Sequence, residues 1–187
     1  VYKRQRAMIT KALSGEIGFK EYLEKVDVYC NNGLDSGYEG DLKTEVECVE
    51  AAKAVYAICL NESLSKHGQD IGTEQVIIEN LANILIYAYV GDSTLSRVIQ
   101  NKDLYVQKNQ VVPELCAKVY TAEQGIRVME YANKILNSIY DGEIPKELES
   151  KFAKLSKRLS LSTDTIGLKK IIGEKVVEAG GYPVQSF

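Results

Sequence analysis

The stretch TEQVIIENLANILIYAYVGDSTLSRVIQ, residues 73–100, is the strongest indicator of the fold class of this chain. Its apolar residues recur every three or four positions, which is the spacing of one face of an α-helix. The residues of this inward stripe are Ile77, Leu81, Ile84, Ala88, Gly91, Leu95 and Val98. Thr73 is placed to cap the helix. Because glycine in mid-helix costs roughly 1 kcal/mol against alanine, Gly91 predicts a close helix crossing.

The same spacing precedes this stretch. Asp41 can cap a helix that runs to a cationic last turn at Lys66 and His67, where Gly68 follows. Its predicted inward face contains Leu42, Val46, Val49, Ala52, Tyr56 and Cys59. Its charged residues are predicted to lie mostly outside, namely Glu45, Glu47, Glu50 and Lys53. His67 is the only histidine, and a helix end explains it better than a catalytic or metal role.

The same helical spacing of apolar residues also occurs after residues 73–100, beyond a predicted polar connection at Asn101 to Val112. Pro113 suits the first turn of a long helix that Asp141 and Gly142 end. The stripe advances by four and three residues alternately, which is typical of the seam of a bundle. Its residues are Leu115, Val119, Ala122, Ile126, Met129, Asn133, Leu136 and Tyr140. Asn133 is better explained as fixing the register than as binding a ligand.

Two shorter helices are predicted after Pro145. The first has an apolar side formed by Leu148, Phe152, Leu155 and Leu159. Its outer side is basic, with Lys151, Lys154, Lys157 and Arg158, and could face a membrane or an acidic partner, although a solvated face is the simpler explanation. The second runs from Thr165 to Ala179, with Leu168, Ile171, Ile172 and Val176 inward, and Gly180 and Gly181 stop it.

These patterns predict an all-α fold, an antiparallel up-and-down helical bundle of about four long helices with short flanking helices. The helices from Asp41, Thr73 and Pro113 are expected to form most of the core, and the two helices after Pro145 to close it. We expect residues 41–187 to form the bundle domain and residues 1–40 an N-terminal junction segment. Residues 1–5, VYKRQ, resemble a translated sequencing adaptor, so we expect this chain to be the tail end of a longer protein.

Composition narrows the classes of function. The net charge of −3 over 187 residues argues against nucleic-acid binding, which needs a basic face. The four cysteines, Cys30, Cys48, Cys59 and Cys116, form no C-x-x-C pair and are interpreted as buried free thiols in a reducing compartment, with Cys59 and Cys116 in apolar helical contexts. No signal peptide is recognised, and the longest apolar stretch, Val76 to Val90, is too short to span a bilayer.

Motifs that carry chemistry are missing from the sequence. It contains no G-x-S-x-G, no phosphate-binding glycine loop and no Glu-x-x-His, which excludes a ferritin-like di-iron site. Glu79 and Asn83 share a helix face near Glu74 and could form part of an active site, but they are better explained as hydrogen-bonding across that face. The residues alone therefore predict no catalytic, cofactor-binding or metal-binding residue.

Three stretches in this order resemble the C-terminal extension of acyl-CoA dehydrogenases, particularly the very-long-chain type and its bacterial relatives. The first is AMITKALSGE, residues 7–16, which resembles the segment just after that family's catalytic core. The second is EQVIIENLANILIYAYVGDSTLSR, residues 74–97, which resembles the long helix of the extension. The third is TIGLKKIIGEKVVEAGGY, residues 165–182, which resembles the glycine-terminated tail.

The resemblance implies a helical domain that packs on the catalytic core of an FAD-dependent acyl-CoA dehydrogenase of fatty-acid β-oxidation and supports its homodimer. In that family a glutamate before a Gly-Thr-Asn motif removes a proton from the acyl-CoA, the flavin takes a hydride, and an electron-transfer flavoprotein accepts the electrons. This chain lacks that motif, so no catalytic or FAD-binding residue is transferred to it, and we expect it to bind no cofactor itself.

The resemblance also bears on location. The long-chain enzyme has a membrane-associating segment in this extension, but the corresponding region here, Asn31 to Gly40, is short and polar, which argues against membrane attachment. We expect a bacterial, cytoplasmic protein. A second interpretation remains open at this point: a free helical scaffold or adaptor domain without enzymatic activity. Arg6 to Asn32 is the segment expected to contact the missing core.

Overall fold

The computed structural model describes residues 37–184. Within that range the elements in chain order are α3 (Lys43–His67), the 3₁₀ turn η1 (Gly68–Thr73), α4 (Gln75–Gln100), α5 (Lys102–Gln107), α6 (Val112–Tyr140), α7 (Lys146–Leu159) and α8 (Thr165–Glu178). The described range contains no strand, so the all-α prediction is confirmed. The junction segment 1–40 lies almost entirely outside the described residues, as does Cys30, and the predicted domain boundary stays a prediction.

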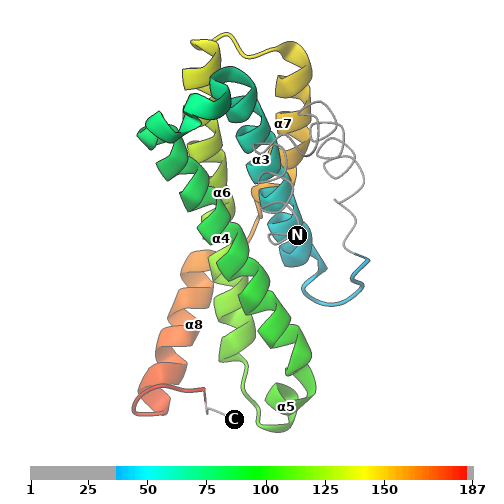
Figure 1. Cartoon of the computed structure of the whole chain (residues 1–187). Coiled ribbons are helices and arrows are strands. Elements are labelled where there is room, and N and C mark those ends of the chain that lie inside the picture. Colours follow the sequence, from blue (N-terminus) through cyan, green and yellow to red (C-terminus); the bar gives the residue numbers. More distant parts are fainter. Residues whose placement is uncertain (1–36, 185–187) are drawn as a thin grey trace.

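The long helices alternate in direction. In Figure 1, α3 runs upward, α4 returns downward, α6 runs upward again and α7 returns over its upper half, which confirms the predicted antiparallel bundle. Helix α8 continues in the direction of α7 but lies beside the lower part of α6. The upper half of the molecule is therefore a four-helix bundle, whereas the lower half consists of α4, α5, α6 and α8.

Helix α3 is the centre of this bundle, since it contacts α4, α6 and α7. The sequence predicted that its charged residues would lie outside, and this is wrong for Glu45 and Lys53, which are each only 6% exposed. The physical reason is that neighbours on three sides cover most of the circumference of α3, so no wide solvent face remains. Its small residues, such as Ala51, Ala54 and Ala57, are buried all round the helix.

Helix α4 has the inward face that its sequence predicts. All seven residues of the predicted stripe, from Ile77 to Val98, are buried. Gly91 lies at a close crossing with α3, because a Cβ atom there would come within 2.8 Å of a methyl carbon of Val49. The prediction of a close crossing at this glycine is confirmed, and it accounts for a residue that otherwise weakens a helix.

Helix α6 buries part of the predicted stripe, since Val119, Ala122 and Leu136 are buried and Met129 and Tyr140 are partly buried against the main core. Ile126 is 63% exposed and Asn133 is exposed, so neither belongs to the seam. The buried residues are Val112, Ala117, Val119, Thr121, Ala122, Gly125, Val128, Ala132, Ile135, Leu136 and Ile139. Because α3, α4, α7 and α8 all contact α6, the buried surface follows those neighbours and not one heptad seam.

Several predicted boundaries are confirmed and two predicted caps are wrong. Asp141 and Gly142 end α6 with positive φ, and Pro145 precedes α7 as predicted. Asp41 instead pairs with Lys102, and Leu42 is the residue before α3. The hydroxyl of Thr73 donates to the Asp70 carbonyl inside η1, while Glu74 precedes α4. The predicted polar connection after α4 contains the short helix α5.

The last two helices differ in burial. Leu148, Phe152, Leu155 and Leu159 of α7 are buried in the main core, as predicted. Helix α8 has no buried residue, and its predicted inward positions Ile171 and Val176 are exposed. The prediction that both helices close the core is therefore wrong for α8, because among the described residues α8 packs mainly on α6, whereas α7 contacts both α3 and α6.

The tightest contact in the bundle is at Gly125 of α6. A Cβ atom there would lie 2.2 Å from the carbonyl oxygen of Leu159, at the end of α7, and 3.2 Å from the sulfur of Cys48 on α3. A backbone carbonyl at the end of a helix cannot swing aside as a flexible side chain can. Gly125 therefore allows α3, α6 and the end of α7 to meet.

We predict that Gly125→Ala lowers the free energy of unfolding by roughly 3 kcal/mol, because the added methyl group overpacks a rigid backbone contact. The matched control is Gly173→Ala on α8, where no atom lies within 4 Å of the position that the added methyl group would occupy. That control should stabilise the chain by roughly 0.5–1 kcal/mol through helix propensity. Urea unfolding followed by circular dichroism measures both, and equal effects would contradict the packing argument.

A buried ion pair joins α3 to α4. The Lys53 ammonium lies 2.7 Å from a carboxylate oxygen of Glu50 and 2.7 Å from one of Asp92. Burial by itself would lower the pKa of Lys53, but the hydrogen bonds to Asp92 and Glu50 raise it above its ordinary value. The lysine is therefore held charged, and it acts as a cross-link between the two helices.

We predict that Lys53→Met lowers the free energy of unfolding by about 2 kcal/mol, since it leaves two carboxylates without their cation. Lys134→Met, which removes an exposed pair with Glu130, should cost less than about 0.5 kcal/mol. Because the folded pKa of Lys53 is raised, its contribution is complete below the unfolded value of 10.5 and is lost as pH rises through the folded pKa. A difference that grows with pH above neutrality would contradict this assignment.

Candidate functional site

Polar side chains gather where α3 and α6 end. The Tyr140 hydroxyl donates to Glu62, and the Lys66 ammonium donates to the carbonyl of Ile139. Burial and the hydrogen bond to Glu62 raise the pKa of Tyr140 to about 12. Each of these groups joins one helix to another, so the cluster stabilises this end of the bundle.

His67 is the last residue of α3, which confirms the prediction of a helix end. Its Nδ1 lies 3.7 Å from a carboxylate oxygen of Glu74, a loose contact that closes the η1 turn. Its Nε2 is buried and has no hydrogen-bond partner among the described residues. Glu79 is exposed, and Asn83 is half-buried, so the structure does not bring this pair together with His67 as a catalytic group.

A second polar group lies on the surface between α4 and α6. The rings of Tyr87 and Tyr131 stack with centroids 5.9 Å apart, and the Lys134 ammonium lies 5.2 Å from the centre of the Tyr131 ring. The pKa of Tyr87 is lowered, most by its hydrogen bond with Tyr131 and less by its hydrogen bond with Arg127. The stacked rings join α4 to α6 at the surface, whereas the cation–π contact between Lys134 and Tyr131 lies within α6.

The cysteines divide into two kinds. Cys48 and Cys59 are buried free thiols, as the sequence predicted for Cys59. Cys116 is exposed, so the prediction that it is buried is wrong. Burial raises the pKa of Cys48 to about 12 and also raises that of Cys59. Since the thiolate is the reactive form, neither buried thiol is activated as a nucleophile.

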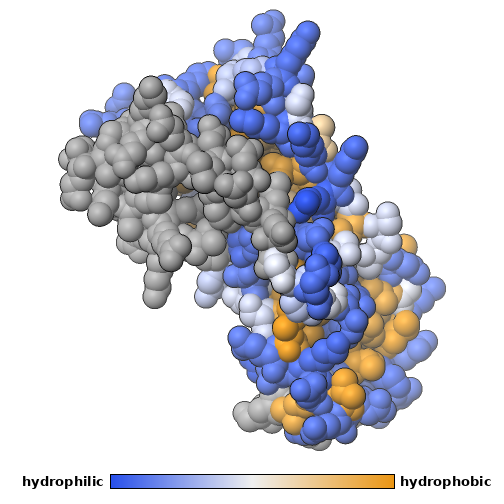
Figure 2. Space-filling view, turned by 90° about the vertical axis from the view of Figure 1, so that its right-hand side faces the viewer, coloured by the Kyte–Doolittle hydropathy of each residue, from blue (hydrophilic) through white to orange (hydrophobic). Residues whose placement is uncertain are grey.

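Apolar side chains reach the solvent along α4 and α8. On α4 these are Val76, Ile78, Ile86, Tyr89 and Val90, and on α8 they are Ile166, Ile171, Val176 and Val177. Figure 2 shows apolar residues at the surface of the lower half of the molecule. Because soluble monomers seldom expose many large apolar residues together, this surface is a candidate for contact with other polypeptide.

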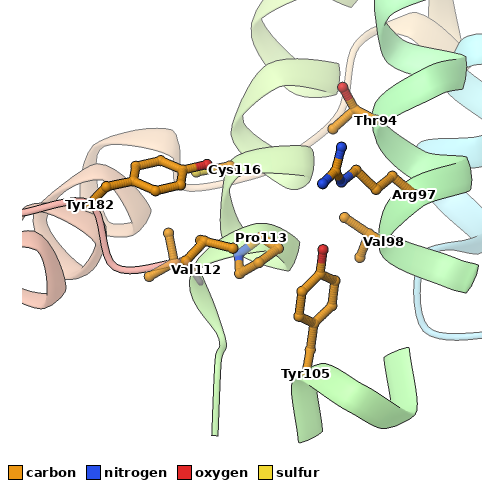
Figure 3. A pocket seen from close by; sticks show the side chains of 9 residues that line it. Thr94, Arg97, Val98, Tyr105, Val112, Pro113, Cys116 and Tyr182 are labelled. Carbon is orange, nitrogen blue, oxygen red and sulfur yellow. The ribbon is translucent and has the colours of Figure 1, made fainter. Parts of the chain in front are cut away.

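A cavity of about 400 Å³ lies where α4 ends and α6 begins. Its wall includes Arg97 of α4, Tyr105 of α5, Cys116 of α6 and Tyr182 after α8 (Figure 3). Sequence reasoning missed this cavity, because its residues come from distant parts of the chain and share no motif. The one signal in the sequence is Arg97, a cation at the close of an otherwise apolar helix.

Two further findings concern residues 37–184. No three His, Cys, Asp or Glu side chains come together there in a way that could hold a metal ion. None of the helices in this range combines the length and the apolar character needed to cross a membrane.

We predict that iodoacetamide at pH 8 modifies Cys116 at least tenfold faster than Cys48 or Cys59. Cys116 is exposed, whereas the buried thiols are shielded and ionise only at much higher pH. Mass spectrometry of tryptic peptides distinguishes the three sites. All three should react at similar rates in concentrated urea, and similar rates in the folded chain would contradict the burial of Cys48 and Cys59.

Comparison with known proteins adds two findings to this geometry. A family model described as acyl-CoA dehydrogenase, C-terminal domain, matches residues 51–152, more than half of the chain. The crystal structure of an acyl-CoA dehydrogenase complexed with FAD from Bacillus anthracis has a similar fold, with a TM-score of 0.74 and 21% sequence identity. A search of curated proteins found no match.

The two chains compared differ greatly in length. The match covers 96% of this chain but only 30% of the Bacillus anthracis chain. The residues that match the family model begin inside α3 and end inside α7, so they contain most of the main hydrophobic core. This chain belongs to the acyl-CoA dehydrogenase family, and its helical bundle corresponds to the C-terminal domain of that family.

Proposed function

We propose that this bundle is the non-catalytic C-terminal part of an FAD-dependent acyl-CoA dehydrogenase of fatty-acid β-oxidation in a bacterial cytoplasm. In this proposal the bundle packs on the catalytic core and supports a homodimer. The core, which is absent from this chain, binds FAD and acyl-CoA and passes electrons to an electron-transfer flavoprotein. Support comes from the family match and from the likeness to a structure that contains FAD.

The observation that carries the packing role is the exposure of α8. It carries six large apolar residues, Ile166, Leu168, Ile171, Ile172, Val176 and Val177, yet no residue of α8 is buried. Ile166 and Val177 are 71% and 80% exposed and lie three turns apart on the same side of the helix. Covering two such side chains would stabilise an interface by a few kcal/mol, at roughly 1.5–3 kcal/mol for a fully buried aliphatic side chain.

The scaffold interpretation makes a different prediction about the coding sequence. An enzyme requires a flavin-binding core upstream of Val1, ending in the Glu-Gly-Thr-Asn motif that carries the catalytic base in this family. Sequencing the gene upstream tests this directly. An initiation codon with a ribosome-binding site immediately ahead of Tyr2 would overturn the proposal in favour of a free adaptor domain.

For the packing role, we predict that Val177→Asp in the full-length protein lowers both its melting temperature and its dimer fraction. The same substitution should leave the melting temperature of the isolated 187-residue chain unchanged, because Val177 makes no buried contact there. Calorimetry and sedimentation velocity measure the two quantities. A charge on an apolar contact is costly only if the contact is made.

The control is Lys154→Asp, which places the same side chain at an exposed position of α7. It should change neither quantity in the full-length protein. If Val177→Asp behaves like this control, α8 is not an interface and the packing proposal fails. If it lowers the melting temperature without changing the dimer fraction, α8 contacts the core of its own chain and the dimer role fails.

A further inference from the structure

The cavity beside Arg97 has the size and shape of a ligand site. Its volume of about 400 Å³ lies in the range of small-molecule pockets. Three parts of the chain meet around it, namely the end of α4, the start of α6 and the segment after α8. Figure 3 shows Arg97 and Tyr105 extending toward Pro113 from one side, while Tyr182 lies near Cys116 on the other.

The cavity has one cation whose charge is not neutralised within the described residues. No ion pair of the Arg97 guanidinium is formed in the range 37–184, and its side chain is exposed. Glu114, which lies near Val98 and Tyr105 of the cavity wall, is paired with Lys118 at 2.6 Å. The guanidinium fork is therefore available to a carboxylate, which it can bind through two parallel hydrogen bonds.

The rest of the wall is apolar or weakly polar. Val98 and Val112 are buried side chains at the floor, and Pro113 and Val184 add further apolar surface. The ring of Tyr182 is 86% exposed at the opening, so one of its faces is free to cover an apolar group.

We propose that this cavity binds a small organic anion, a carboxylate on an aromatic or short aliphatic body. The carboxylate pairs with Arg97, and the body lies against Val98, Val112 and the ring of Tyr182. The proposed site uses only residues 94–184 of this chain. It therefore stands or falls independently of the proposed dehydrogenase function.

The test uses the 187-residue chain and two probes of the same shape, phenylacetate and its neutral amide, phenylacetamide. Ligand-observed NMR titration should give saturable binding of phenylacetate and at least tenfold weaker binding of phenylacetamide, because the amide forms no charge-assisted pair with Arg97. Phenylacetate should also slow the alkylation of Cys116, which lies on the cavity wall, and phenylacetamide at the same concentration should not.

Variants at Arg97 test whether its positive charge binds the carboxylate of the ligand. Arg97→Met should weaken phenylacetate binding at least tenfold, and Arg97→Lys should give an intermediate loss, since lysine keeps the charge without the planar fork. Arg127→Met is the matched control, because it removes an exposed arginine of α6 that does not line the cavity, and it should leave the affinity unchanged. Circular dichroism confirms that each variant is folded.

Three results would overturn the proposal. The first is equal affinity for the acid and the amide, which would show that charge plays no part. The second is an affinity for phenylacetate that Arg97→Met leaves unchanged. The third is the absence of saturable binding below about 10 mM, the weakest affinity expected for a ligand of this size that fills a pocket.

Discussion

The crossing of α3 with α4 and α6 determines how the other helices of the bundle can pack. Two glycines allow it, Gly91 against Val49 and Gly125 against Cys48 and the carbonyl of Leu159. Because neither position has a Cβ atom, the backbones of α3, α4 and α6 approach more closely than they could with larger side chains between them. The packed interior is as dense as an organic crystal, so a methyl group at such a crossing has no space to occupy. The buried Lys53 pair with Asp92 then joins α3 to α4 near the same place.

This crossing also divides the molecule into two parts with different surfaces. Above it, α3, α4, α6 and α7 enclose one large apolar cluster. Below it, a smaller cluster formed by Leu42, Val49, Leu95, Val98 and Ala117 fills the space, and α8 lies outside it. The last residue of α7, Leu159, packs against Gly125 of α6. Because α8 begins after this point, it lies beside only the lower part of α6 (Figure 1). The exposed apolar side chains of α8 and the cavity beside Arg97 both belong to this less enclosed half.

The division explains why one domain can combine a stable interior with surfaces suited to contact. In the upper half, polar side chains such as Tyr140 and Lys66 hydrogen-bond between helices. In the lower half, Val177 and Ile166 face solvent, and the guanidinium of Arg97 forms no ion pair within the described residues. A family match confined to residues 51–152 covers the enclosed half most fully. We therefore propose that this chain contacts other molecules through the less enclosed half.

Hydrophobic periodicity was enough to predict the all-α class, the helix stripe from Ile77 to Val98 and the core face of α7. In those helices one face is packed and the other is solvated, so a 3.6-residue period maps directly onto burial. The same periodicity could not predict the exposure of Ile126 and Asn133 on α6 or the burial of Lys53 and Glu45, because these depend on how many neighbours surround each helix. Helix packing in three dimensions is what leaves α8 outside the core and brings Arg97, Cys116 and Tyr182 to one cavity. Periodicity describes a single helix, whereas contacts between distant segments follow from the crossing that Gly91 and Gly125 permit.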